Sequence, residues 1–98
     1  MGNSLKSATF LIESRLAEAA SGDSEALYEL GVAYSTGTFG LDVDLIEAHK
    51  WFNLAALGGS RLAQQCRAEI SEEMTAREIA EAQRQARAWL SMGHRVAA

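Results

Sequence analysis

The chain contains no proline, only one cysteine and seven aromatic residues. Without proline, no helix is forced to break at a fixed backbone angle. A single cysteine, Cys66, excludes an internal disulfide and a thiolate cluster for zinc, and it fits a reducing compartment. The first twenty residues contain no apolar run longer than Phe10–Ile12, and Glu13 follows at once. We therefore expect no secretory signal and no membrane span, and we predict a cytoplasmic protein.

Positive charge is scarce in the first half of the chain. Met1 to His49 carry two bases and eight acids, a net charge of −6, whereas Lys50 to Ala98 carry seven bases and five acids, +2. The bases of the second half alternate with glutamates at helical spacings, so no basic footprint for nucleic acid is predicted. These charges are either solvated helix pairs or a means of attracting an oppositely charged partner, because complementary fields steer association.

What the chain does contain favours helix. Ala, Leu, Glu and Arg recur throughout, and these side chains lose little freedom in a helix. Hydrophobic residues make up 48% of the 98 residues, which suits one folded domain with a small core. The composition predicts a single all-α domain over residues 1–98.

Glycine-rich turns divide this domain into helices. Breaks at Gly22, 36–40, Gly58–Gly59 and Gly93, together with the capping pattern of Thr75 and Glu78, predict five helices. They are expected over residues 4–20, 24–36, 44–57, 60–73 and 75–92. The expected N-terminal caps are hydroxyl or carboxylate residues that accept a backbone N–H of the first turn. They are Ser24, Asp44, Ser60 and Thr75.

Parts of the chain repeat with an offset of 36 residues. Ala19–Ser24 aligns with Ala55–Ser60, with Ala-Ala, Gly and Ser in register. A period of this length predicts an array of helical hairpins, each of which buries its apolar face by stacking on its neighbours. Gly31 lies inside the predicted helix over residues 24–36, where glycine costs about 1 kcal/mol relative to alanine. We therefore predict that a partner helix packs where its side chain would stand.

The predicted helices over residues 24–36 and 44–57 would form the middle hairpin of this array. Its residues resemble the Sel1-like repeats, which are relatives of the tetratricopeptide repeats. The resemblance covers residues 24–59 and rests on small residues, glycines and aromatics at fixed spacings. These are Ala26, Leu30, Gly31, Tyr34, Gly37, Gly40, Leu41, Asp44, Ala48, Trp51, Phe52, Ala55, Ala56 and Gly58.

The resemblance implies a short right-handed α-solenoid of antiparallel helical hairpins. Residues 4–20 would be the second helix of a partial repeat, and residues 60–92 a divergent repeat with a capping helix. Two features depart from the family pattern: Arg67 stands where the repeat has glycine, and the loop at 38–40 is one residue longer. Trp51 and Trp89 lie on apolar stripes and are predicted to be core rather than partner anchors.

The sequence contains few residues that could form a catalytic or metal site. The soft ligands His49, Cys66 and His94 fall on different predicted elements, so we predict no metal site, no cofactor and no enzymatic activity. Cys66 is expected to be a small core residue rather than a reactive thiol. His49, between Ala48 and Lys50, is expected on an exposed helix edge.

The remaining candidate is a binding surface. In hairpin arrays the first helices line a concave groove, and the resemblance assigns to it Glu25, Tyr28, Val32, Ser35, Arg61, Gln64 and Ala68. Apolar residues at its centre and charges at its rim would suit a protein or peptide partner. An ordinary solvated surface is the alternative for these residues. For the whole chain, the alternative function is self-association through the uncovered ends of a short array.

Overall fold

The computed structural model describes residues 3–96, with side chains described from Ala8 onward. Within that range every regular element is an α-helix, as predicted. The helices are α1 (Asn3–Ala20), α2 (Ser24–Thr36), α3 (Leu45–Leu57), α4 (Arg61–Ser71) and α5 (Ala76–Ser91). Each lies within three residues of its predicted limits, because glycine turns and polar caps mark both ends in the sequence.

The helix caps agree with the sequence at three of four positions. The side chains of Asp44, Ser60 and Thr75 each accept a backbone N–H of the following first turn, and Thr75 forms a full capping box with Glu78. The prediction of Ser24 was wrong. Asp23 caps α2 by accepting from the N–H groups of Glu25 and Ala26, since its backbone is extended and its carboxylate is a strong acceptor beside a helix N-terminus.

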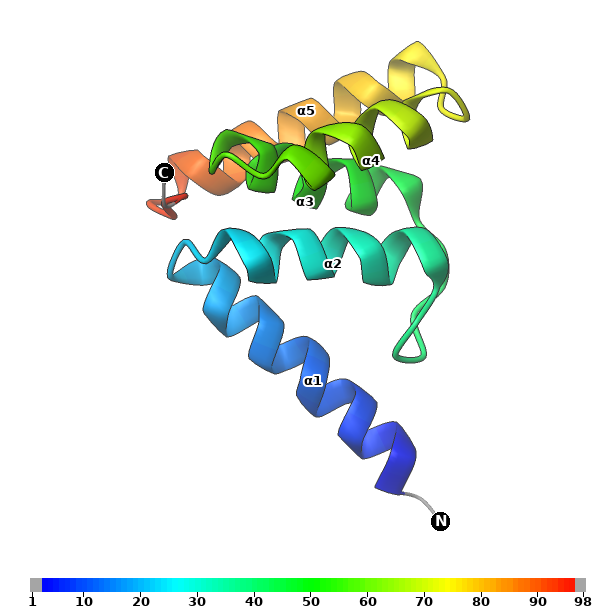
Figure 1. Cartoon of the computed structure of the whole chain (residues 1–98), viewed down its shortest axis with the longest axis vertical. Coiled ribbons are helices and arrows are strands. Elements are labelled where there is room, and N and C mark those ends of the chain that lie inside the picture. The colour runs from blue at the N-terminus through cyan, green and yellow to red at the C-terminus, as the bar shows by residue number, and fades with distance from the viewer. Residues whose placement is uncertain (1–2, 97–98) are drawn as a thin grey trace.

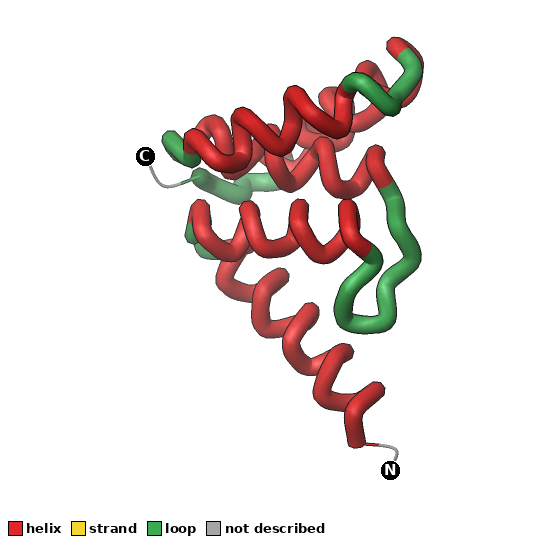
Figure 2. Tube along the Cα trace, turned by 45° about the vertical axis from the view of Figure 1, so that its right-hand side comes forward, coloured by secondary structure: helices red, strands yellow, loops and turns green. Residues whose placement is uncertain are grey.

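The helices stack into a short array (Figure 1). The contact between α2 and α3 is the most extensive, α1 packs on α2, and both α4 and α5 pack on α3. The first half of α1 runs away from α2, and the loop between α2 and α3 projects to the same side (Figures 1 and 2). α1 therefore adds one helix to the face of α2 and leaves part of that face uncovered.

The centre of the core is the tight contact between α2 and α3. Phe52 and the leucines Leu27, Leu30 and Leu54 are fully buried. A Cβ atom at Gly31 would stand 2.4 Å from Cδ1 of Phe52. Glycine is therefore required here by close approach of the Phe52 ring, which confirms the prediction for this position.

The other face of α3 is covered by α5. Ala82 and Ala86 are buried, which lets the two helices approach closely. The rings of Trp51 and Trp89 meet edge to face with centroids 4.9 Å apart, a geometry favoured by aromatic quadrupoles. Trp51 is buried and Trp89 is half-buried against the core, so both belong to it.

Candidate binding surfaces

The predicted groove coincides in part with an apolar recess on α2. Tyr28 and Val32 are half-buried and line a recess of about 510 Å³. The other lining residues are Glu29, Ala33, Thr38 and Phe39. We call this the α2 recess.

The other predicted groove residues lie around it rather than in it. Glu25 is exposed on α2, and the half-buried Ser35 donates a hydrogen bond from its hydroxyl to the carbonyl of Val32. The predicted α4 residues Arg61, Gln64 and Ala68 are all exposed and do not line the α2 recess.

Tyr28 lies where α2 approaches α3 and α4. Its ring lies 5.8 Å from that of Phe52 on α3. Burial raises the pKa of the Tyr28 hydroxyl, and Cys66 on α4 raises this pKa further through charge and a hydrogen bond. Cys66 itself is half-buried against the core, so it is a core-edge residue rather than a fully buried one.

Phe39 is a wall of the α2 recess that sequence reasoning missed. It is 42% exposed and is the non-glycine residue with a positive φ, 58°, within the described chain. The left-handed conformation costs a non-glycine residue roughly 1 kcal/mol or more. The loop thus holds an aromatic ring at the rim of the recess at some cost. The signal in the sequence was a phenylalanine inside an otherwise small and polar glycine loop.

The lining of the α2 recess includes one acidic residue. Glu29 lines it and forms an ion pair with Arg15 on α1, and Arg15 also binds Glu18 at 2.9 Å. These contacts raise the pKa of the Arg15 guanidinium, chiefly through the Glu29 hydrogen bond. Arg15 thereby pairs with two of the acids in residues 1–49, a segment whose net charge is −6.

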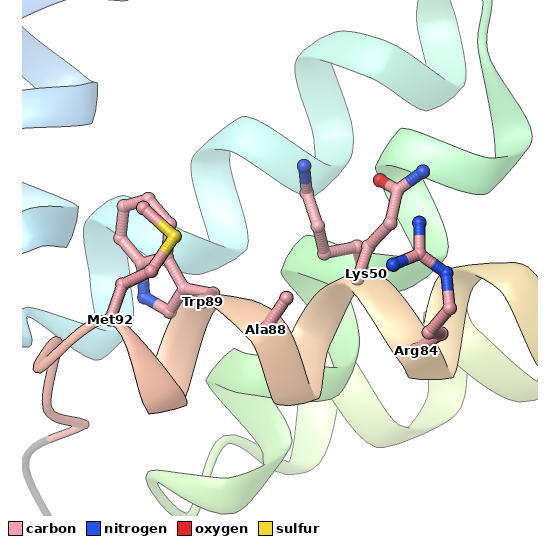
Figure 3. Close-up of a pocket in the computed structure, with 6 residues that line it drawn as sticks. Lys50, Arg84, Ala88, Trp89 and Met92 are labelled. Atoms are coloured by element: carbon pink, nitrogen blue, oxygen red, sulfur yellow. The ribbon is translucent and has the colours of Figure 1, made fainter.

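A second recess lies between α3 and α5 and was not predicted. Its volume is about 200 Å³, and Figure 3 shows the residues that line it. They are Lys50, Arg84, Gln85, Ala88, Trp89 and Met92. We call this the α3–α5 recess. Lys50 pairs with Glu47 at 2.7 Å, and Arg84 pairs with Glu81 through two hydrogen bonds of 2.8 and 2.6 Å.

The prediction of a solvated His49 was wrong. His49 is only 3% exposed, and its Nδ1 atom has no hydrogen-bond partner among the described residues. Burial lowers the pKa of the imidazole, and the positive charge of Arg67 on α4 lowers it further. Neighbours cover α3 on several sides, so a position that is an edge in a single hairpin is interior in the array.

The soft ligands do not converge. His94 stacks on Trp89 with ring centroids 3.8 Å apart, whereas His49 lies beside Arg67 and Cys66 beside Tyr28. Across residues 3–96, no group of three or more His, Cys, Asp or Glu side chains is placed to hold a metal ion. None of the helices in this range has the length and apolarity needed to cross a membrane.

Comparison with known proteins gives one match. Residues 24–60 match the family model of the Sel1 repeat, which places α2, α3 and the turn after them in one repeat unit. No curated protein and no solved structure matches the chain significantly.

Proposed function

Because the chain is a Sel1-like repeat protein, we propose that it is a non-enzymatic module that binds a protein or peptide on the exposed face of α2. Sel1 repeats are in general protein-interaction modules. Binding at this face is consistent with that general role. A cytoplasmic location remains a prediction from the sequence.

The observation that carries the proposal is the α2 recess. Its volume of about 510 Å³ exceeds the roughly 150 Å³ of a cavity that holds one benzene molecule. The walls provided by Tyr28, Val32 and Phe39 are apolar, and exposed apolar surface of this kind marks interaction sites. The recess has room for one or two large side chains of a partner.

Charge indicates the chemistry of that partner. Glu25 lies exposed on the same helix, Glu29 lines the recess, and the surrounding half of the chain is strongly acidic. Acidic fields steer basic partners to the surface. We therefore propose a segment in which one or two apolar side chains are flanked by Lys or Arg. The exposed residues of α4, Arg61, Gln64 and Ala68, would form the far rim of this surface.

Peptide selection with matched variants tests the proposal. Peptides selected from a random library on the wild-type chain are expected to combine aromatic or aliphatic residues with Lys or Arg. Val32→Asp places a charge in the α2 recess and should weaken their binding at least about tenfold. Leu62→Asp is the control, because Leu62 is 59% exposed on α4 and lies outside the recess.

Two results for these variants would reject the α2 recess as the binding site. Unchanged affinity of Val32→Asp, with its fold verified by circular dichroism, would reject the α2 recess. Equal losses in Val32→Asp and Leu62→Asp would also reject it, since the effect would then not depend on the recess.

Self-association is a second candidate function, favoured by exposed apolar residues near both ends of the array. Phe10 on α1 is 67% exposed, and Met92 after α5 is 72% exposed. A second copy of the chain would cover such residues. Sedimentation equilibrium over a hundredfold range of concentration tests this function. A monomer at all concentrations would reject it, and Phe10→Ser should lower association if α1 forms the contact.

A further inference from the structure

We propose that the α3–α5 recess is a second binding site, for a carboxylate joined by a short spacer to an apolar group of about the size of a benzene ring. The ligand is either a free acid or the last residue of a peptide. The site shares no lining residue with the α2 recess, so it does not depend on the function proposed for that surface.

The polar end of the recess contains hydrogen-bond donors from two helices. Lys50 comes from α3 and Arg84 from α5 (Figure 3). Gln85 also lies on α5. An ammonium group has three N–H donors and a guanidinium has five. The ion pairs with Glu47 and Glu81 use one donor of Lys50 and two of Arg84. Both cations therefore keep donors for an incoming anion.

Among the side chains that line the recess, Lys50 has the surroundings that most favour binding of a second anion. It is only 14% exposed, and its Nζ atom lies 4.7 Å from the ring centroid of Trp51. Most of the side chain is therefore covered by protein, and anionic partners stabilise a cation held in such a position. Glu47 is the carboxylate paired with it in the structure, so a second carboxylate at the recess would add to its stabilisation.

The existing acids compete with the ligand but do not close the site. Hydrogen bonds from Arg84 and Gln85 hold the pKa of Glu81 at about 2, so this carboxylate stays ionised near neutral pH. The Arg84 side chain is nevertheless 61% exposed, and ion pairs at exposed positions contribute little. Its guanidinium is therefore free to turn one edge toward a ligand while it keeps contact with Glu81.

The apolar end of the recess is formed by Ala88, Trp89 and Met92. Trp89 is held in place by Trp51 and by His94, which stacks on it. Its indole Nε1 is buried and has no hydrogen-bond partner in the described chain. Aromatic and thioether groups together favour contact with an apolar ring.

Size and spacing define the ligand. The recess of about 200 Å³ is slightly larger than the roughly 150 Å³ of a cavity that holds benzene. Gln85 and Trp89 are four residues apart on α5, which places them about 6 Å apart along the helix axis. A phenyl group separated from a carboxylate by two or three bonds spans that distance, whereas a small inorganic anion leaves the apolar end empty.

The test is an NMR titration of the full chain labelled with nitrogen-15, with 3-phenylpropanoate as the probe. The indole N–H signal of Trp89 is expected to shift and saturate. The matched control is 3-phenylpropanamide, which keeps the ring and loses the charge, and acetate keeps the charge and loses the ring. Neither control should saturate the signal. Equal shifts from the acid and the amide, or no saturable shift from the acid, would overturn the proposal.

Variants locate the contact. Arg84→Gln should weaken binding of 3-phenylpropanoate about tenfold, as expected for loss of one charge-assisted hydrogen bond. Arg87→Gln is the matched control, because Arg87 is exposed on α5 and does not line the recess. Unchanged affinity of Arg84→Gln would overturn the assignment. Since Arg84 is mostly exposed, a failure to fold is not expected, and the spectrum itself verifies folding.

A third comparison identifies the source of the carboxylate. A pentapeptide ending in Phe with a free carboxyl group is compared with its amidated form. Binding of the free form at least as tight as that of 3-phenylpropanoate assigns the site to chain ends of proteins. Binding of 3-phenylpropanoate alone assigns it to small aromatic acids.

Discussion

The helices α2 and α3 pack closely on each other, whereas the next pair along the chain, α4 and α5, both pack mainly on α3. In the first pair, Gly31 lets the ring of Phe52 lie against the backbone of α2. In the second pair, Arg67 occupies the position 36 residues after Gly31. Its guanidinium reaches back to the side-chain oxygen of Asn53 on α3. A long polar side chain thus replaces a close helix contact.

The last helix accordingly packs elsewhere. Close contacts of α5 are mainly with α3, where Ala82 and Ala86 are buried and Trp89 meets Trp51. The opposite face of α5 contains exposed arginines, including Arg77 and Arg87. An apolar seam on one side and a charged face on the other are expected of a capping helix. This division of α5 into an apolar and a charged face supports the prediction from the sequence that α5 is a capping helix, which stays a prediction.

Phe52→Ala is expected to have the largest effect on this comparison. Truncating a fully buried phenylalanine removes its burial and leaves a cavity, at a cost of about 3 to 5 kcal/mol in the free energy of unfolding. Urea denaturation followed by tryptophan fluorescence measures the loss. Trp89→Ala should cost less, because Trp89 is only half-buried on α5. A larger loss of unfolding free energy for Trp89→Ala than for Phe52→Ala would contradict the expectation that the α2–α3 contact contributes more to stability than the packing of α5 on α3.

A surface leucine provides the control. Leu62→Ala removes an apolar side chain that is 59% exposed and should change the unfolding free energy by about 0.5 kcal/mol or less. A loss for Phe52→Ala no greater than this control would contradict its place at the centre of the core.

Substitutions at the two equivalent positions test the role of glycine directly. Gly31→Ala forces a Cβ to within 2.4 Å of the Phe52 ring, so it should destabilise by about 1 to 3 kcal/mol although alanine favours helix. Arg67→Ala removes one partly buried hydrogen bond and should cost about 1 kcal/mol. Thermal and urea unfolding of both variants measure the difference.

A double variant separates steric overlap from other causes. Adding Phe52→Leu to Gly31→Ala relieves the overlap, so the double variant should lose less stability than the sum of the single losses. Additive losses would show that Gly31 is required for a reason other than the ring of Phe52.

The sequence was informative where local chemistry decides structure. Glycine turns and caps predicted five helices, and the cost of Gly31 inside a helix predicted its close contact with α3. At α2 the cap was misplaced by one residue, since Asp23 and Ser24 are both good capping residues and only the backbone geometry distinguishes them.

Positions that depend on the last helix were not predictable in the same way. The α3–α5 recess forms because α5 packs on α3. This packing depends on non-local contacts, among them the contact between Trp51 and Trp89. His49 was misplaced for a related reason. A single-hairpin pattern predicts one buried stripe, whereas buried residues of α3 surround much of the helix, and they are Ala48, His49, Trp51, Phe52, Leu54 and Ala55.

The pH dependence of stability gives the smallest expected effect and tests the junction of α3 with α4. Burial and Arg67 lower the pKa of His49 in the folded chain below its ordinary value of 6.5, so the unfolded chain binds a proton more readily. Stability should therefore be full above about pH 6.5 and fall as the pH decreases toward the folded pKa. Urea unfolding between pH 5 and 7.5, in wild type and His49→Gln, measures this slope. The His49→Gln variant should lose this slope. A slope that persists unchanged in His49→Gln would contradict its assignment to His49 at the junction of α3 with α4.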